Sequence, residues 1–518
     1  MNKTILIASL ILASAGPGHA EENLVPSKPT GPIYNYYCTW AAEAYQTGQG
    51  ADHVDLKELL KGDGTPGMRE EKLTDPKDGW LNFYPKVRSD LWFLFDDGYY
   101  EVKTTTAEGM ASMVFDPKRF PSLADKSPGD RIQALSDLVK QSGWHGMGLW
   151  LRGFPGDKTG VEKLDWSRRA GVGYWKIDSV DLPMNYRRLR AKHDPDLILE
   201  YSTWAHGVFT GQGETDMKAL LPKTVFPDHR VFLHGADVVR IYDVDQPLGQ
   251  ITALLRTAGL LNAAKGDDAV TPVINVEDHV SIAAGLACSA GIMRFPTTGK
   301  RPDGDPDIFL AGPRHSKRRM DEVVRALRWQ RIAPPLPANA LPVAIDDEGF
   351  ADTWNLTLGE TWGNPKSGPI TQSAPARISR GLPLAEVRGE GPKPFVLACR
   401  HPHGGPVSVT TLGRFDNAQG YRIPLADVSV DVGDLPETVG VFGRYASLTL
   451  RSSQPVGHVR ILAQDLAADA SRDITPEVKI DGKQITIPGN LIESLGLSAA
   501  TPGDESDPGL VLRISRTP

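Results

Sequence analysis

The chain has few cysteines, no excess of basic residues and, after its first twenty residues, no long apolar run. Its three cysteines lie far apart without the paired spacing of a metal site. At most one disulfide could form, and we expect all three side chains to occupy buried apolar positions. Lys and Arg number 57 against 64 Asp and Glu, a net charge of −7 with no surplus to neutralise phosphates. We therefore expect neither a nucleic-acid partner nor a membrane partner. The cysteines are Cys38, Cys288 and Cys399.

The composition is otherwise that of a globular protein with a hydrophobic core. Of the 518 residues, 40% are hydrophobic and 23% are charged, and at roughly 100–200 residues per domain this length predicts two to four domains. The first twenty residues resemble an export signal, with a positive charge at Lys3, an apolar run over residues 4–15 and a cleavage site after Ala20. We expect residues 1–20 to be a signal peptide and the protein to be exported, either to the periplasm or out of the cell.

Short apolar runs alternate with amphipathic stretches up to about residue 330. The runs lack polar–apolar alternation, which indicates strands buried on both faces, as in a parallel sheet. Polar or aromatic residues stand where one run after another ends, and in a TIM barrel all those ends face one bowl. We therefore predict a (β/α)8 barrel over residues 21–332, in preference to a doubly wound sheet. The predicted strands are Ile33–Trp40, Asp90–Asp97, Gly146–Arg152, Gly173–Asp178, Leu197–Ser202, Val238–Asp243 and Gly291–Phe295, and the predicted helices are Asp130–Ser142, Pro247–Asn262 and Val276–Ala290.

The last third of the chain has a different character. Residues 333–339 are rich in proline and form the predicted linker, and residues 340–518 contain short apolar runs between turns rich in glycine and proline. This pattern predicts a C-terminal all-β sandwich domain. Asp465, Asp469 and Asp473 lack the spacing of a calcium-binding loop, so we expect them to be solvated surface residues.

The predicted bowl mixes flat aromatic side chains with carboxylates and cations. Aromatic faces cover the C–H face of a sugar ring and charged groups bind its hydroxyls, so we expect an oligo- or polysaccharide substrate. Glycoside hydrolysis needs two carboxyl groups at the anomeric carbon. Asp178 and Asp243 are the best pair because each ends a predicted strand, whereas Asp181 and Asp245 are rivals that could instead cap helices. Lys176 shares a strand face with Asp178 and could hold it ionised.

Taken in order, these strand ends resemble those of the retaining α-galactosidases of glycoside hydrolase families 27 and 36. The resemblance covers about residues 33–330 and implies a retaining exo-glycosidase that acts on terminal α-galactoside-like linkages without a cofactor or a metal. The matching segments are Cys38-Thr39-Trp40, Phe95-Asp96-Asp97-Gly98-Tyr99, residues 116–121, Gly148-Leu149-Trp150, Tyr174-Trp175-Lys176-Ile177-Asp178, Tyr201-Ser202-Thr203-Trp204 and Arg240-Ile241-Tyr242-Asp243.

The resemblance also implies a role for each matching side chain. Asp178 would be the nucleophile and Asp243 the acid/base. Asp96 and Asp97 would bind hydroxyl groups of the sugar. The other substrate-binding residues that the resemblance implies are Trp40, Trp150, Lys176, Trp204 and Arg240.

Several departures from the family pattern leave the identity of the sugar open. Tyr99 stands where relatives often have Trp, and the spacing from Arg240 to Asp243 is shorter than in family 27. Ser202 and Thr203 precede Trp204 where family 27 carries an additional specificity residue.

Two other interpretations remain. A non-catalytic carbohydrate-binding protein on the same barrel would keep the aromatic residues but lose one carboxylate role. A metal-dependent hydrolase would need clustered histidines at the strand ends, and His145, His206 and His234 form no His-x-His pair.

Overall fold

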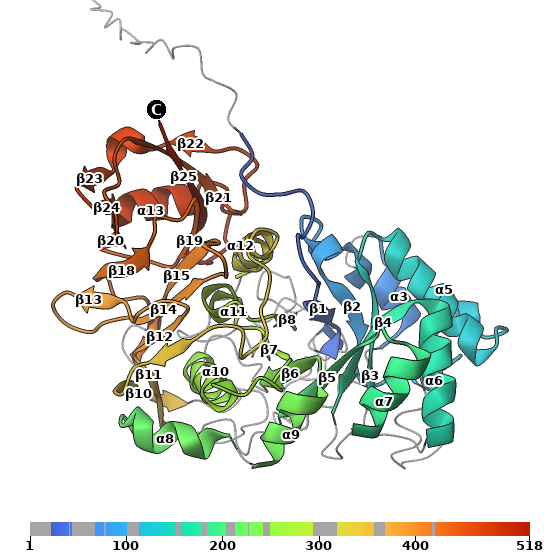
Figure 1. The fold of residues 1–518 in the computed structure, drawn as a ribbon. Coiled ribbons are helices and arrows are strands. Elements are labelled where there is room, and N and C mark those ends of the chain that lie inside the picture. The colour runs from blue at the N-terminus through green and yellow to red at the C-terminus, as the bar shows by residue number, and fades with distance from the viewer. Residues whose placement is uncertain are drawn as a thin grey trace, which may run out of the picture.

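The computed structural model describes residues 22–40, 42–43, 68–76, 79–100, 113–151, 157–178, 184–203, 213–225, 227–241, 249–293, 319–356, 368–416 and 420–517. The predicted signal peptide, Trp204 and Asp243 lie outside these ranges. The described residues form an α/β barrel and a β-rich C-terminal part, with α10, α11 and α12 lying between them (Figure 1).

Eight parallel strands form the barrel and confirm the predicted fold class. Their order is β7-β6-β5-β4-β3-β2-β1-β8, with β1 paired to both β2 and β8. A parallel bridge between Asn275 and Ser289 joins β7 to the segment before β8, so the barrel is nearly closed. The strands are β1 (Tyr36–Cys38), β2 (Trp92–Phe95), β3 (Gly146–Leu151), β4 (Val172–Ile177), β5 (Ile198–Thr203), β6 (Val238–Ile241), β7 (Val273–Val276) and β8 (Gly291–Ile292).

Amphipathic helices cover the outside of the barrel. In α5 (Pro128–Gln141), which overlaps the predicted helix Asp130–Ser142, Ile132, Leu135 and Val139 are buried at helical spacing. In the part of the chain that the structure describes, no helix is long and apolar enough to cross a membrane. The other helices are α3 (Glu70–Thr74), α6 (Asp157–Ala170), α7 (Met184–His193), α8 (Met217–Thr224), α9 (Pro227–Gly235), α10 (Gln250–Ala264), α11 (Val280–Leu286) and α12 (Asp321–Gln330).

The prediction of one long helix over Val276–Ala290 is wrong at both ends. Val276 closes β7, which the sequence analysis missed, and the helix α11 covers only Val280–Leu286. Asp278 (φ +59°) and Ala287 (φ +52°) adopt left-handed backbone conformations on either side of α11. Such residues end regular structure, so β7, a turn and a short helix replace the predicted helix.

The C-terminal part is built from two main sheets. The larger sheet has the order β22-β21-β25-β19-β15-β14-β12-β9 and the smaller has the order β13-β18-β20-β24-β23. Val428, Val430 and Val432 alternate with more exposed residues along β18, so one face of that sheet lies in the core. The strands of the larger sheet are β9 (Val343–Ile345), β12 (Arg377–Arg380), β14 (Phe395–Arg400), β15 (Val407–Leu412), β19 (Thr438–Phe442), β21 (Val459–Asp465), β22 (Arg472–Asp473) and β25 (Gly509–Arg516); those of the smaller are β13 (Glu386–Arg388), β18 (Asp427–Gly433), β20 (Ser447–Ser452), β23 (Lys479–Asp481) and β24 (Gln484–Pro488).

Two antiparallel hairpins and one helix complete this part. The hairpin β10–β11 is joined to the pair β16–β17 by the ion pair between Asp352 and Arg414. The segment predicted as the linker lies against the barrel, since the Leu336 and Ala338 amides donate to the carbonyls of Ala287 and Pro272. The elements are β10 (Gly349–Leu356), β11 (Gly368–Pro375), β16 (Arg414–Asp416), β17 (Gly420–Arg422) and α13 (Gly489–Gly496).

The helix α12 is joined to the larger sheet by buried charges. The Arg325 guanidinium donates to both carboxylate oxygens of Asp465, at 2.9 and 3.1 Å. Asp465 is buried, so the prediction that it lies on the solvated surface is wrong. Asp469 and Asp473 keep substantial exposure and pair with Arg328 and Arg460.

Candidate active site

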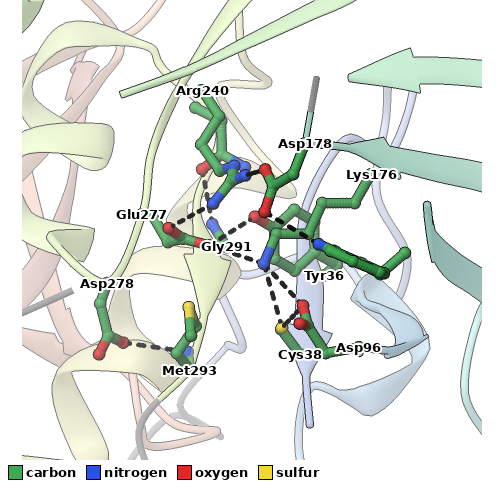
Figure 2. Close-up of polar contacts among 12 residues, drawn as sticks. Tyr36, Cys38, Asp96, Lys176, Asp178, Arg240, Glu277, Asp278, Gly291 and Met293 are labelled. Carbon is green, nitrogen blue, oxygen red and sulfur yellow. Dashed lines mark hydrogen bonds and ion pairs between the residues drawn. The ribbon is translucent and has the colours of Figure 1, made fainter. Parts of the chain in front are cut away.

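A cluster of charged side chains gathers at the carboxyl ends of the barrel strands (Figure 2). We call it the barrel cluster and define it as Asp96, Lys176, Glu200, Arg240 and Glu277, which come from or directly follow β2, β4, β5, β6 and β7. All five side chains are buried. Because parallel strands present these ends on one rim, residues far apart in the sequence meet there.

Asp178 lies beside the barrel cluster and keeps some exposure. It stands one residue beyond β4, and its amide donates to the Leu151 carbonyl at 2.9 Å. Its Oδ1 accepts from the Arg240 guanidinium and its Oδ2 accepts from the Trp150 indole N–H at 2.9 Å. The side chain is 17% exposed. Each carboxylate oxygen thus has a separate donor, and the group is oriented while a ligand can still reach it.

Lys176 does not contact Asp178 in the way that the sequence suggested. Its ammonium Nζ lies 2.8 Å from Asp96 Oδ2 and 3.4 Å from Glu277 Oε1. Burial alone would lower the pKa of Lys176, but Asp96 and the other nearby acidic groups outweigh burial and raise this pKa well above its usual value. Lys176 therefore stays charged inside the barrel, and it is Arg240 that pairs with Asp178.

Asp96 is held by donors on several sides. Its Oδ2 accepts from Lys176 and from the Cys38 thiol at 2.9 Å, and its Oδ1 accepts from the Asp97 amide at 2.8 Å. Burial would raise the pKa of Asp96, but Lys176 and these hydrogen bonds lower it overall. The neighbouring Asp97 is partly exposed and accepts a hydrogen bond from the Tyr100 hydroxyl. Of the two predicted hydroxyl-binding residues, Asp97 is the more accessible.

The three cysteines are buried and free, but one of them lies among charges. Cys288 and Cys399 occupy buried positions as predicted. Cys38 instead lies between Asp96 and Lys176, with its Sγ 3.4 Å from the Lys176 Nζ. The prediction of an apolar position is therefore wrong for Cys38. Burial raises the pKa of the Cys38 thiol well above its usual value, and Asp96 adds to the rise.

Arg240 lies behind Asp178 and has no exposed surface. Its three guanidinium nitrogens face three carboxylates: Nη2 pairs with Asp178, Nη1 lies 3.0 Å from Glu277 and Nε lies 3.2 Å from Glu200. Burial would lower the pKa of Arg240, but Asp178 and Glu277 raise it well above its usual value. The guanidinium thus faces carboxylates on three sides, and its contact with the sugar stays a prediction.

Sequence reasoning missed Glu200 and Glu277. Glu200 lies within β5, where its Oε2 accepts from the Tyr174 hydroxyl and the Asn275 amide, both at 2.7 Å. Burial raises the pKa of Glu200, while Arg240 and these hydrogen bonds oppose the rise. A carboxylate inside an apolar strand was a usable signal for Glu200. Glu277 was hidden because β7 was missed and Glu277 fell inside the predicted helix Val276–Ala290.

Tyr36 links the two missed carboxylates. Its hydroxyl lies 2.8 Å from Glu277 Oε1 and 3.2 Å from Glu200 Oε1. The Tyr36 ring occupies space that a side chain at Gly291 would need, because a Cβ placed there would lie 2.4 Å from the ring. Glycine at the start of β8 therefore allows Tyr36 to reach across the barrel.

The predicted aromatic walls are only partly described. Trp150 is nearly buried and lies parallel to Tyr100, with ring centroids 6.3 Å apart and 7° between the planes. Trp40 is half-buried and packs against the hydrophobic core. Trp204 and Asp243 lie outside the described residues, as do the rivals Asp181 and Asp245.

Among the described residues, no group of three or more His, Cys, Asp and Glu side chains is arranged to hold a metal ion. The two cations of the barrel cluster occupy the positions between its carboxylates. In this part of the chain, the arrangement offers an oriented carboxylate as its reactive group.

No protein-family model matches the chain, and no curated protein matches its sequence. Among solved structures, the chain is similar to the carboxyl transferase domain of Rhizobium etli pyruvate carboxylase, with 13% identity and a TM-score of 0.29 over 63% of this chain and 52% of that chain. It is also similar to a noncanonic maltogenic alpha-amylase from Thermotoga neapolitana (10% identity, TM-score 0.33, 87% of this chain, 95% of that chain). A third similar structure is a beta-arabinopyranosidase (10% identity, TM-score 0.30, 94% of this chain, 57% of that chain).

The chain thus spans about half the length of the transferase domain that it matches. TM-scores and identities this low carry no conclusion about activity, and the three proteins differ in what their names say they do. The resemblance to families 27 and 36 accordingly stays a prediction from the strand-end motifs.

Proposed function

We propose that the protein is an exported, retaining exo-glycosidase that hydrolyses terminal α-galactoside-like linkages of an oligo- or polysaccharide. The setting of Asp178 carries this proposal. The residue follows β4 at the carboxyl end of the barrel, is 17% exposed and has each oxygen bound to a different donor. A carboxylate held in this way is oriented for attack on a bound substrate.

The proposed reaction has two displacement steps. In the first, an oxygen of Asp178 attacks the anomeric carbon and forms an ester, the glycosidic C–O bond breaks, and Asp243 gives its proton to the departing oxygen. In the second, Asp243 takes a proton from water, the water oxygen attacks the anomeric carbon, and the ester bond to Asp178 breaks. Two inversions at the same carbon leave the configuration retained.

The other residues support this reaction in two ways. Asp97 binds sugar hydroxyls, and Trp40, Trp150 and Trp204 form the walls of the subsite. Lys176 and Arg240 act through Asp96 and Asp178, since 3% and 0% of their side chains are exposed.

The test is hydrolysis of a panel of p-nitrophenyl glycosides, with proton NMR of the first product formed. We expect turnover of the α-galactoside or a closely related α-glycoside, with the α-anomer appearing first. Appearance of the β-anomer first would contradict retention. Sugar binding without turnover of any substrate would favour the non-catalytic carbohydrate-binding alternative.

The acid/base assignment has its own test. Asp243→Ala should slow hydrolysis of substrates with poor leaving groups far more than that of activated aryl glycosides, whose departure needs little protonation. Added azide should restore turnover and give a glycosyl azide of retained configuration. If the rate falls equally for both substrate classes and azide does not restore it, Asp243 is not the acid/base and Asp245 becomes the candidate.

Asp237, six residues before Asp243 in the sequence, is a further carboxyl to consider, but its position excludes it from that role. It precedes β6, at the amino end of the strand, and pairs with Arg190 at 2.8 Å while accepting the Leu199 amide at 2.9 Å. It therefore lies at the opposite rim of the barrel from Asp178.

A further inference from the structure

Glu277 contacts both cations of the barrel cluster. Its Oε2 lies 3.0 Å from Arg240 Nη1, and its Oε1 lies 3.4 Å from Lys176 Nζ and 2.8 Å from the Tyr36 hydroxyl. The side chain has no exposed surface. Glu277 is therefore out of reach of a ligand in the bowl and can affect the reaction only through the side chains of the barrel cluster. Figure 2 shows it on the far side of Arg240 from Asp178.

Resting on the proposed function, we propose that Glu277 is a positioning residue that keeps Arg240 paired while Asp178 is bound to the sugar. The reason is a change of charge during the reaction. When Asp178 forms the glycosyl ester it loses its negative charge, but Arg240 stays positive and buried. A buried cation without a counter-charge is strongly destabilising. Glu277 and Glu200 supply that counter-charge in the intermediate and in the transition states that flank it.

The same contacts matter before the reaction begins. A guanidinium that faces a single carboxylate can form two hydrogen bonds with it. Such a bidentate pair would stabilise the negative charge of Asp178 and make this carboxylate a weaker nucleophile. Here Arg240 divides its nitrogens among Asp178, Glu200 and Glu277. Asp178 consequently pairs with only one nitrogen of the guanidinium, Nη2, and remains a stronger nucleophile than it would be in a bidentate pair.

The backbone holds Glu277 firmly in this position. The amides on either side donate to the segment that contains β8: Val276 to the Ser289 carbonyl at 2.9 Å, and Asp278 to the Gly291 carbonyl at 2.6 Å. Asp278 adopts a φ of +59°, and its carboxylate accepts the Met293 amide at 3.3 Å. A residue other than glycine in this conformation persists where its surroundings enforce it, so the turn fixes where the Glu277 side chain enters the barrel.

The test uses the full chain and three variants. Glu277→Gln keeps the size of the side chain and removes its charge, and Glu277→Asp keeps the charge. Tyr36→Phe removes the hydroxyl that contacts Glu277 and Glu200 while leaving every charge in place. Asp90→Asn is the matched control, because Asp90 is buried and pairs with Arg331 at 2.7 Å, away from the barrel cluster. On an aryl glycoside that the wild-type protein hydrolyses, we measure kcat and KM per folded molecule.

We expect Glu277→Gln to lower kcat by about tenfold or more with little change in KM, since the side chain does not reach the ligand. Glu277→Asp should recover part of the loss, Tyr36→Phe should lose less than Glu277→Gln, and Asp90→Asn should keep the wild-type kcat. Labelling with a 2-deoxy-2-fluoro glycoside, which traps the ester on Asp178, should lower the Tm of Glu277→Gln more than that of the wild type. In the labelled Glu277→Gln variant, Arg240 has lost the charges of both Asp178 and Glu277, whereas in the labelled wild type it has lost only that of Asp178.

This role would be overturned if Glu277→Gln had the wild-type kcat or changed only KM. It would also be overturned if Glu277→Gln and Glu277→Asp lowered kcat equally. If Glu277→Gln fails to fold, the comparison of Tyr36→Phe with Asp90→Asn decides, and equal kcat values in those two variants would overturn it. A wild-type protein that hydrolyses no glycoside would overturn the proposed function and this inference with it. A hydrolytic wild type with an unaffected Glu277→Gln would overturn the inference alone.

Discussion

Among the described residues, the barrel cluster and the junction between α12 and the larger sheet each bury several charged side chains, and they do so differently. At the junction between α12 and the larger sheet, Arg325 pairs with Asp465, and nearby Arg331 pairs with Asp90. In the barrel cluster, two cations face three carboxylates, and Arg240 also faces Asp178. Among the described residues, Arg325 and Arg331 each pair with one carboxylate, and Arg319, just before α12, pairs with Glu322 and Asp507. In the barrel cluster, both cations are shared among several carboxylates.

The comparison shows that burial of charge does not by itself mark an active site. Both regions need complementary charges, because an isolated buried ion is strongly destabilising. What distinguishes the barrel cluster is its excess of carboxylates and its contact with Asp178, a partly exposed group. In the proposed reaction Asp178 loses its negative charge when it forms the ester. The additional carboxylates beside it then still neutralise the buried cations.

The largest effect is expected for Asp178→Asn. This change removes the proposed nucleophile but preserves its shape, so turnover should fall by about ten thousandfold. Arg240 keeps Glu200 and Glu277 as partners, so the Tm should change little. The check is a kcat measurement alongside thermal unfolding, with Asp469→Asn, an exposed residue paired with Arg328, as the control. Turnover near the wild-type rate would remove Asp178 from the reaction.

How much of this site the sequence could predict depends on where each residue sits. Asp96, Lys176, Asp178 and Arg240 were found because they end strands that were recognised as strands. Glu277 was missed because the apolar residues after β7 carry a helical spacing that runs into α11, and the turn between them depends on hydrogen bonds to β8. No local pattern reveals such contacts between segments.

The junction shows the same limit. The sequence around Asp465 reads as a polar surface segment, and the prediction followed that pattern. Arg325, which buries it, lies 140 residues earlier in the chain. The fold class was predictable because it depends on a repeated local pattern, whereas pairings of this kind arise only when distant segments pack.

The next largest effect is expected for Arg325→Leu, which leaves Asp465 buried without its partner. The free energy of unfolding should fall by about 3–5 kcal/mol, while kcat and KM per folded molecule stay at wild-type values. The measurement is denaturant unfolding combined with kinetics. Adding Asp465→Asn should recover part of the stability, because it removes the unpaired charge. An activity loss as large as that of Asp178→Asn would erase the distinction between the two regions.

A smaller effect is expected for Asp97→Ala in the bowl. Charge-assisted hydrogen bonds to sugar hydroxyls are worth about 1.5–3 kcal/mol each, so sugar affinity should fall by the corresponding factor. Asp97 also accepts from the Tyr100 hydroxyl, so Tyr100→Phe is the matched control that removes this bond but keeps the carboxylate. Affinity should be measured by titration calorimetry with the folded fraction known. A large drop in Tm with unchanged affinity would make Asp97 a structural residue.

The smallest effect is expected for a buried carboxyl outside both regions. Asp194 lies between α7 and β5 and is 6% exposed. Burial and the neighbouring Asp196 raise its pKa from 3.8 to about 6. Between pH 4 and pH 6 the folded protein therefore holds a proton that the unfolded chain has released, so this group lowers stability as pH rises through that window.

Asp194→Asn removes this penalty. At pH 7.5 the variant should be more stable than the wild type by about 1 kcal/mol, and at pH 4 the two should unfold alike, because Asp194 is protonated there in the folded state. Denaturant unfolding at both pH values checks this, with Asp196→Asn expected to give a smaller gain in the same direction. An equal gain at pH 4 and pH 7.5 would mean that the charge of Asp194 is not the cause. Arg168 and Arg190 oppose the rise in the pKa of Asp194 but do not offset burial and Asp196, so the gain in stability from Asp194→Asn should appear only at pH values where Asp194 is charged.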